Sequence, residues 1–385
     1  MLRDPKLLVL LLAGSLTTMT GGVIAPVLPE IIEHLQLDTG LAANLVSVHN
    51  LTIALFSPPL GILADRVGRI KVLVPALIFY ALFGVAGAFM HDFWSLLVLR
   101  ALLGAASGGI AAASLGLLGS MYEGQARSQA LGWATSTLTI TGITDPLLGG
   151  WAGANRWQNA FYLYGVGLPI AFLAAAVLQE KPRKTKSHQV SQTKLHQVLL
   201  QQHTLKVLIA LSLTSVAMYA VVIYAPLYLN ATINADTLLN GIVLASRAIG
   251  AGVISAFGAS KLARRLGSSR AIACGFGLMA VTLAVIPLLN QVSWIVVSAI
   301  LFGVGFGIVL PNLYNALANL APEQLRASVL AIGTGMGFLG QFLSPILLAP
   351  VLNFAGLEAV FYAAAAIAIA TGMVLLVFRT SGESF

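Results

Sequence analysis

Runs of apolar residues long enough to cross a lipid bilayer recur along the whole of this 385-residue chain. Only 9% of the residues are charged and 58% are hydrophobic, with a mean hydropathy of +0.90. A soluble domain carries about a quarter charged residues, so this chain lacks the polar residues that a water-facing surface needs. About 20 apolar residues cross the hydrocarbon core as a helix, which satisfies its own backbone hydrogen bonds. The sequence therefore predicts an all-α membrane protein.

Polar interruptions divide the apolar sequence into separate runs. We expect twelve transmembrane helices, at roughly 7–31, 41–63, 71–90, 95–118, 128–152, 158–179, 205–229, 238–260, 271–290, 294–316, 328–352 and 358–378. An N-terminal signal peptide is the alternative for the first run, since Arg3 and Lys6 precede it. That run is too long for a typical signal core and has no obvious small-residue cleavage site, which favours a membrane helix.

The basic residues are distributed unevenly between the two sides that these helices define. With a cytoplasmic N-terminus, 18 of the 21 lysines and arginines fall in cytoplasmic segments, Arg156 falls outside, and Arg100 and Arg247 lie within helices. This bias follows the positive-inside rule and predicts that both termini are cytoplasmic. The net charge of +8 therefore reflects topology and does not indicate a nucleic-acid partner. The short loops and termini suggest a bacterial inner (plasma) membrane.

A short polar segment between the second and third runs has a second copy later in the chain. The segment Gly61–Lys71 reads GILADRVGRIK, and aligning Gly68 with Gly267, 199 residues later, matches it to the looser copy LARRLGSSR. The same offset matches Gly104 with Gly303, Gly108 with Gly307 and Pro146 with Pro345. Two parallel six-helix repeats are therefore predicted, at 1–179 and 205–385, joined by a basic cytoplasmic linker at 180–204.

These motifs resemble those of the major facilitator superfamily of transporters over essentially the whole chain. Residues 61–71 are similar to its loop 2–3 signature (G-x-L-a-D-r-x-G-r-k), and Arg100-x-x-x-Gly104-x-x-x-Gly108 is similar to its fourth-helix motif. The resemblance implies the fold of that superfamily, with two six-helix bundles. It also implies secondary active transport by alternating access.

Two further motifs resemble one branch of that superfamily, the drug/proton antiporters. Gly132 and Pro146-x-x-Gly149-Gly150 are similar to their fifth-helix motif, although that pattern has glycine at two positions that hold Thr141 and Asp145 here. The segment Asn155–Phe161 is similar to the loop before their sixth helix. The resemblance implies proton-coupled efflux of small amphipathic molecules.

The first copy of the repeated polar segment contains the candidate gating motif: Gly61, Asp65, Arg66, Gly68 and Arg69. Gly68 permits a tight backbone turn, and the carboxylate of Asp65 suits the positive N-terminus of a neighbouring helix. The resemblance implies a latch between the two halves at the cytoplasmic face. Ordinary loop charge that serves topology is the alternative.

Three charged residues within the expected helices are candidates for proton coupling. Asp145 is the one acid deep within a span, at a depth from the outer face similar to that of Arg100. Intramembrane acids usually face a cavity or a charged partner. The resemblance brings helices 5 and 8 together, which implies a bridge between Asp145 and Arg247 that protonation would break. A pair with Arg100 and a static structural ion pair remain alternatives, and Arg100 can also snorkel outward.

Small residues within the helices are candidates for helix packing, and uncharged polar residues are candidates for lining a substrate cavity. Gly104 and Gly108 lie on one helix stripe and suit close helix packing, as do Pro146, Gly149 and Gly150 in the fifth helix. Candidates for lining a substrate cavity near the midplane are His49, Asn50, Tyr219, Tyr224, Asn312, Asn315 and Gln341. A helix–helix hydrogen bond is the alternative for each of them.

Other function classes fit the sequence less well. The single cysteine, Cys274, argues against a cysteine metal site, and no phosphate-binding loop is found, so no cofactor or metal is expected. The expected partners are a small-molecule substrate, protons and the lipid bilayer. Proton-coupled uptake of an organic anion or nutrient is the near alternative. A non-transporting sensor or an intramembrane enzyme is more remote, because an enzyme needs a clustered nucleophile and base.

Overall fold

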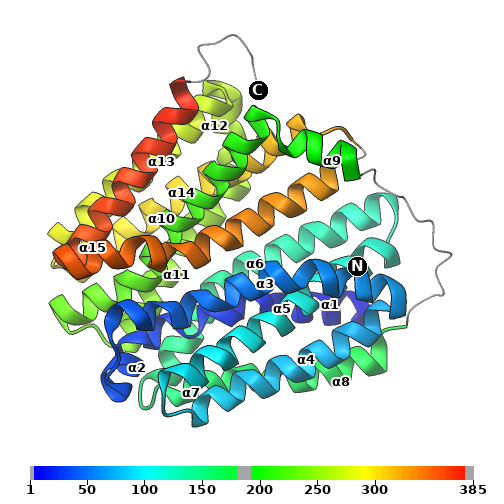
Figure 1. Cartoon of the computed structure of the whole chain (residues 1–385), viewed down its shortest axis with the longest axis horizontal. Helices are drawn as coiled ribbons and strands as arrows, with labels where there is room; N and C mark the ends of the chain where they lie inside the picture. Colours follow the sequence, from blue (N-terminus) through cyan, green and yellow to red (C-terminus); the bar gives the residue numbers. More distant parts are fainter. Residues whose placement is uncertain (1–3, 180–191, 324, 378–385) are drawn as a thin grey trace. The chain divides into compact units, whose positions relative to one another are not determined.

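The computed structural model describes residues 4–179, 192–323 and 325–377, which are helical almost throughout and contain no strand (Figure 1). The all-α prediction is therefore confirmed. The chain divides into two compact units: a first unit of residues 1–183 with 229–245, and a second unit of residues 184–228 with 246–385. The domain boundaries at 179 and 205 stay a prediction, and the first part of the predicted linker, Arg3 and Arg379 lie outside the described residues.

The first unit contains the helices from the N-terminus to the linker. They are α1 (Pro5–Gly22), η1 (Ala25–Val27), α2 (Leu28–Leu35), α3 (Thr39–Val67), α4 (Arg69–Ala86), η2 (Gly87–Phe89), α5 (Phe93–Met121), α6 (Gly124–Gly153), α7 (Gln158–Tyr162), η3 (Leu163–Val166) and α8 (Gly167–Val177). Asp4, Asp38 and Asp92 cap α1, α3 and α5, because each side chain accepts a hydrogen bond from a backbone N–H two or three residues later.

The second unit contains most of the remaining helices. They are α9 (Gln192–Leu199), α10 (Gln202–Ile233), α11 (Thr237–Phe257), α12 (Ala259–Leu266), α13 (Ser268–Val285), η4 (Ile286–Leu288), α14 (Val292–Leu320) and α15 (Arg326–Val377). The end of α10 and the start of α11 belong to the first unit. The helix α15 is two helices merged across a kink at Gly356, whose φ of 80° lies in the left-handed region that glycine favours.

The described residues include ten helices that are long and apolar enough to cross a membrane. The helix α6 has the required length but is not among the ten, because serine, threonine and glycine are frequent along it. The helix α15 is one of the ten, yet it covers the two runs predicted at 328–352 and 358–378. With α6 included and α15 divided at Gly356, the described part of the chain has a helix for each of the twelve predicted runs.

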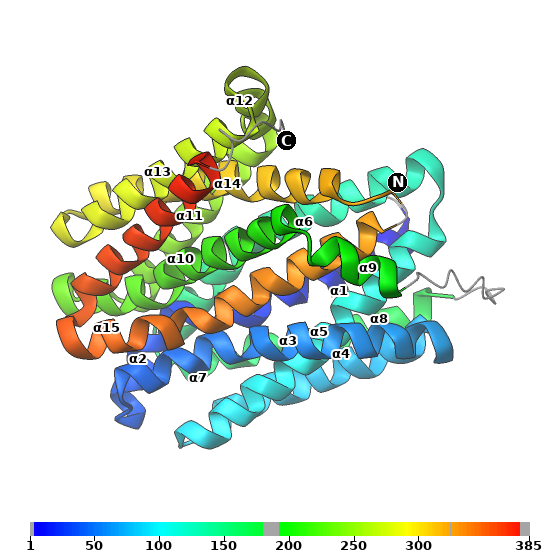
Figure 2. The ribbon, with the colours of Figure 1, turned by 45° about the horizontal axis from the view of Figure 1, so that its top comes forward.

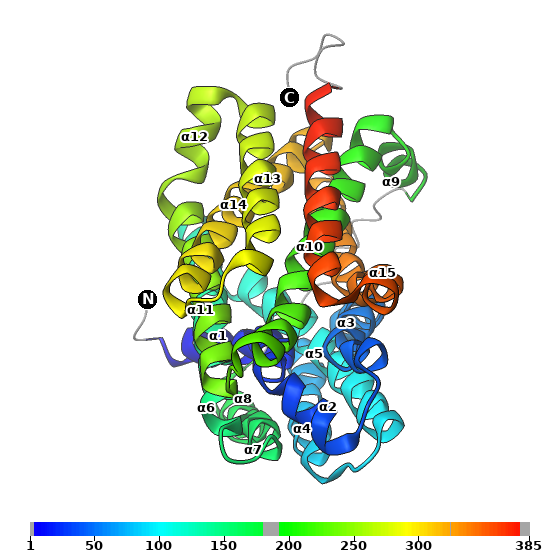
Figure 3. The same cartoon turned by 90° about the vertical axis from the view of Figure 1, so that its left-hand side faces the viewer.

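Within each unit the long helices pack side by side. In the first unit α3 packs along α5, and α4 packs along α5 and α8 (Figure 2). In the second unit α13 packs along α14 and α15 (Figure 3). Glycines allow other helices to approach each other closely. A Cβ built on Gly303 of α14, for example, would collide with the backbone of α11 at Arg247.

The repeated polar segment has the same backbone conformation in both copies. Gly68, between α3 and α4, has φ 110° and ψ 136°, and Gly267, between α12 and α13, has φ 84° and ψ 147°. The N–H of Gly68 donates to the carbonyl of Ala64 over 3.0 Å, and the N–H of Gly267 donates to that of Ala263 over 2.9 Å. A side chain other than glycine would be strained at such positive φ angles. The two turns therefore end equivalent helices in the same way.

Candidate functional site

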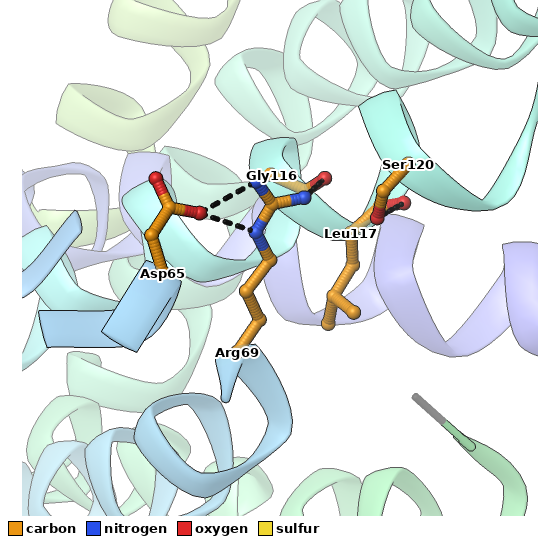
Figure 4. A network of polar contacts seen from close by, with 5 residues as sticks. All are labelled: Asp65, Arg69, Gly116, Leu117 and Ser120. Atoms are coloured by element: carbon orange, nitrogen blue, oxygen red, sulfur yellow. Dashed lines mark hydrogen bonds and ion pairs between the residues drawn. The ribbon is translucent and has the colours of Figure 1, made fainter. Parts of the chain in front are cut away.

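The candidate gating motif lies where α3 meets α4, against α5. Asp65 accepts two hydrogen bonds from Arg69, one from Nε at 3.1 Å and one from Nη2 at 2.7 Å (Figure 4). The Nη1 of Arg69 donates to the carbonyl of Gly116 in α5. The Arg69 side chain is 13% exposed and the Asp65 side chain is 63% exposed. Asp65 thus pairs with Arg69 while most of its carboxylate surface remains open.

The turn at Gly68 makes this arrangement possible. The chain changes direction at Gly68, between Val67 and Arg69, and the guanidinium of Arg69 therefore lies beside the last turn of α3. Gly116 leaves room for the guanidinium, because a Cβ there would lie 2.8 Å from the Nε of Arg69 and the arginine side chain would have to shift. Of the other predicted members, Gly61 faces α5 and Arg66 is exposed. The structure therefore brings Asp65, Gly68 and Arg69 together on one face of the first unit.

Arg100 of α5 is buried at the centre of a polar network, with 1% of its surface exposed. Its Nε donates to the carbonyl of Leu45 over 2.9 Å, and its Nη1 donates to the carbonyl of Thr20 over 2.6 Å and to the hydroxyl of Tyr164 over 2.9 Å. Its Nη2 contacts the Nδ1 of His49 over 3.1 Å. These partners come from α1, α3 and η3. The side chain joins three elements, and it does not snorkel.

The glycine stripe of α5 allows α3 to approach Arg100. A Cβ on Gly104 would collide with the side chain of Thr52 and the backbone of His49. A Cβ on Gly108 would lie 3.1 Å from the backbone nitrogen of Ser57. The stripe is therefore a packing surface, as small residues between membrane helices usually are. It also holds His49 beside the guanidinium.

Asp145 of α6 is buried against α1, with 4% of its surface exposed. The hydroxyl of Thr18 donates to its Oδ2 over 2.9 Å, and Thr18 also lies 2.8 Å from the hydroxyl of Thr141. A Cβ on Gly22 would lie 2.7 Å from the Cβ of Asp145, so glycine is required there. Among the described residues the carboxylate forms no ion pair with Arg100.

Directly after Asp145, the end of α6 packs on the start of α11 through backbone atoms. The hydroxyl of Thr237 donates to the carbonyl of Gly150 over 2.8 Å. A Cβ on Gly241 would lie 2.5 Å from the carbonyl oxygen of Pro146, and one on Gly150 would collide with the carbonyl of Thr237. Gly149 lies against the backbone that follows α1. The predicted packing residues Pro146, Gly149 and Gly150 thus form one close contact of α6 with α1 and α11.

Arg247 lies on α11 in the second unit. Its Nε is buried and has no hydrogen-bond partner in the described part of the chain. Its carbonyl approaches Gly303 as the carbonyl of His49 approaches Gly104, so Arg247 and His49 occupy matching positions in the two repeats. The predicted bridge to Asp145 would join the two units, and it stays a prediction.

The seven predicted cavity residues have different surroundings. His49 belongs to the Arg100 network, while Asn312 donates to the carbonyl of Ile308 in its own helix over 2.7 Å. The Nδ2 of Asn50 and the hydroxyl of Tyr224 are buried without a hydrogen-bond partner in the described residues. The others are Tyr219, which is buried, Gln341, which is half-buried, and Asn315, which is exposed.

Sequence reasoning missed the uncharged partners of the two buried charges. Thr18, Thr20 and Tyr164 hold Asp145 and Arg100, yet threonine and tyrosine are ordinary residues in a membrane helix. Half of the contacts that Arg100 makes are to backbone carbonyls, for which a sequence carries no signal. No group of three or more His, Cys, Asp or Glu residues that could hold a metal ion occurs among the described residues.

The comparisons with known proteins agree with this architecture. The family model of the Major Facilitator Superfamily matches residues 10–345 and, in a second match, residues 207–384. The chain therefore belongs to the Major Facilitator Superfamily. It is a membrane transporter of that superfamily, whose members bind small-molecule substrates, and not an enzyme.

Three similar proteins illustrate the relationship. The tetracycline resistance protein, class B, of Escherichia coli is 22% identical over 348 residues, which cover 88% of this chain and 86% of that protein. The quinolone resistance protein NorA of Staphylococcus aureus is 23% identical over 360 residues, or 92% of each. A bacterial homologue of the human lysosomal transporter Spinster, solved in an inward-facing and occupied conformation, has a TM-score of 0.80 at 15% identity, and covers 98% of this chain and 95% of that one. The last similarity shows the fold alone.

Proposed function

We propose that the chain exports small amphipathic molecules by alternating access, driven by protons. The buried carboxyl group of Asp145, whose one side-chain donor among the described residues is the hydroxyl of Thr18, is the observation that carries this proposal. The drug resistance relatives support the direction of transport and the class of substrate. We also place both termini at the cytoplasmic face of a bacterial inner membrane, following the distribution of basic residues.

The position of Asp145 explains how a proton could act on the transport cycle. A buried carboxylate with one neutral donor is poorly compensated, so its charge depends strongly on its surroundings. The next residue, Pro146, is part of the contact between α6 and α11. Proton binding at Asp145 removes a charge beside that contact. The contact between α6 and α11 then opens or closes according to whether Asp145 is protonated.

The gating motif supplies the second part of the proposed cycle. Because Asp65 is mostly exposed even while paired with Arg69, it is available to a helix end from another part of the chain. Arg69 is tied to Gly116 of α5 and keeps the turn in place. Asp65 thus serves as the latch on the side opposite to Asp145.

Transport into proteoliposomes under an imposed pH gradient tests the role of Asp145. Asp145→Asn should abolish transport driven by the gradient and retain substrate exchange at equal pH on both sides. Glu123→Gln is the matched control, since Glu123 precedes the same helix without capping it through its side chain. Full gradient-driven transport by Asp145→Asn would contradict the proposal.

Uptake of an organic anion with protons is the second candidate. It is favoured by the buried cation Arg247, whose Nε lacks a hydrogen-bond partner in the described residues. An anionic substrate would satisfy this donor. Vesicles of known orientation, energised with pH gradients of each sign, separate uptake from export.

A further inference from the structure

A cavity of about 730 Å³ lies in the first unit, at the end that the basic residues assign to the outside. Its walls come from three places along the chain. Glu30 and His34 belong to α2, Ala88 to η2, and residues 153–159 with Tyr162 to the segment from the end of α6 to α7. This segment contains the loop that resembles the one before the sixth helix of the antiporters. The proposed transport mechanism makes no use of it.

Two residues of the cavity walls each carry a buried polar atom that has no hydrogen-bond partner among the described residues. These atoms are the Oε2 of Glu30, an acceptor, and the Nε1 of Trp157, a donor. Trp157 is only 3% exposed. Buried polar groups are nearly always paired in folded proteins. An acceptor and a donor left unpaired in the walls of one cavity indicate a site for a ligand that offers the complementary groups.

The charges near Glu30 favour a cation. The carboxylates of Glu33 and Asp236 both act on Glu30 and increase the negative potential there. Arg156 also lines the cavity, but its side chain is exposed to solvent. The described residues contain no metal-binding group of His, Cys, Asp and Glu. An organic cation is therefore the better match than a metal ion.

The cavity also offers aromatic surface to such a cation. Trp157 packs edge-on against Phe161, with ring centroids 5.6 Å apart, and Tyr162 packs similarly against Phe89 over 6.1 Å. Aromatic faces attract ammonium groups and bury the apolar body of a ligand. Tyr162 is partly exposed at the cavity, so its ring is accessible from outside.

We propose that this cavity binds a protonated amine that carries an aromatic body and a nearby hydroxyl or ether oxygen. The ammonium N–H donates to the Oε2 of Glu30, and the oxygen of the ligand accepts from the Nε1 of Trp157. The site lies wholly within the first unit and is separate from the coupling residue Asp145. It goes beyond the proposed function, because it holds an organic cation whether or not that cation is transported.

Protection of a cysteine in the cavity wall measures binding at this location. The full chain carries Cys274→Ser and Asn159→Cys, and it is labelled with a maleimide in lipid nanodiscs, where both faces are accessible. The probe is 2-amino-1-phenylethanol, and 1-phenylethanol is its neutral counterpart. The amine should protect the cysteine and the alcohol should not. Equal protection by both compounds, or none by the amine, would overturn the proposal.

Variants of the wall residues test the assigned contacts. Glu30→Gln should weaken protection by at least about tenfold, as expected when a buried charge pair loses one partner. Glu123→Gln, which changes an exposed carboxylate of the same unit that does not line the cavity, should change it by less than about twofold. Trp157→Phe replaces the indole by a smaller aromatic ring without the N–H, so it should abolish the preference for 2-amino-1-phenylethanol over 2-phenylethylamine. Unchanged protection in Glu30→Gln would refute the site.

Asp145→Asn separates this inference from the proposed transport mechanism. It should leave protection by the amine unchanged while it abolishes transport driven by a pH gradient. If it abolished protection as well, the cysteine would be shielded by binding elsewhere in the pathway, and the cavity would not be an independent site. If transport survived while Glu30→Gln still lost protection, the coupling role would fail and the amine site would stand.

Discussion

Replacing Arg100 with lysine keeps the buried positive charge but removes the shape of the guanidinium. The native side chain makes four contacts, to Leu45, Thr20, Tyr164 and His49. A lysine ammonium is a compact group on a flexible stem and cannot reproduce the planar fork that reaches three elements at once. The carbonyl of Thr20 remains paired after the change, because the hydroxyl of Tyr164 also donates to it over 2.9 Å.

The expected loss can be worked from the contacts that lysine gives up. The contacts to Leu45 and His49 both join Arg100 to α3, and no other side chain among the described residues donates a hydrogen bond to these two atoms. A hydrogen bond to a charged group contributes about 1.5–3 kcal/mol. Losing two of them should lower the free energy of unfolding of Arg100→Lys by about 3 kcal/mol or more.

Unfolding by SDS in mixed micelles, followed by tryptophan fluorescence, measures this free energy. Arg66→Lys is the control, because Arg66 lies on α3 and is exposed. It should change the stability by less than about 0.5 kcal/mol. If Arg100→Lys were as stable as Arg66→Lys, the network around Arg100 would not hold α1, α3 and η3 together.

Three further substitutions test packing and charge in the first unit. Gly104→Ala should destabilise the protein by about 1–3 kcal/mol, because its Cβ would enter α3. Gly132→Ala, with nothing within 4 Å of its Cβ, should stabilise α6 by up to about 1 kcal/mol, and both are measured by the same SDS titration. The hydroxyl of Tyr122 donates to Asp4 over 2.5 Å and lowers the pKa of that carboxyl below its ordinary value. Since a lowered pKa stabilises only above the unfolded value, the stability difference between wild type and Tyr122→Phe should be present at neutral pH and vanish as the pH falls through the folded pKa. A difference that did not depend on pH would contradict this assignment.

The helices were predictable because hydrophobic length and turn chemistry act locally. Each long apolar run lies on a helix, and the glycines at 68 and 267 mark equivalent turns in both copies. Two predicted runs are interrupted by a 3-10 turn, since η1 at Ala25–Val27 separates α1 from α2 and η3 at Leu163–Val166 separates α7 from α8. Pro26 lacks an N–H and favours such a change of helix type in η1.

The surroundings of the charged residues were not predictable from the sequence. Asp145 and Arg100 were identified as buried charges, but their partners are hydroxyls and carbonyls from distant segments. The cavity beside Glu30 was missed for a similar reason. Glu30 and Trp157 are 127 positions apart in the sequence, and the packing of η1, which leads directly into α2, against the end of α6 brings both residues into the walls of one cavity.

The contact between α6 and α11 has a consequence for the energy of a transport cycle. Gly150 and Gly241 approach the facing helix through backbone atoms, and Thr237 contributes one neutral hydrogen bond. Such a bond contributes about 1 kcal/mol net. A tenfold difference in proton concentration supplies about 1.4 kcal/mol, which is the same order. A modest proton gradient can therefore separate this contact between α6 and α11 reversibly. An interface of large interdigitated side chains would cost more free energy to separate.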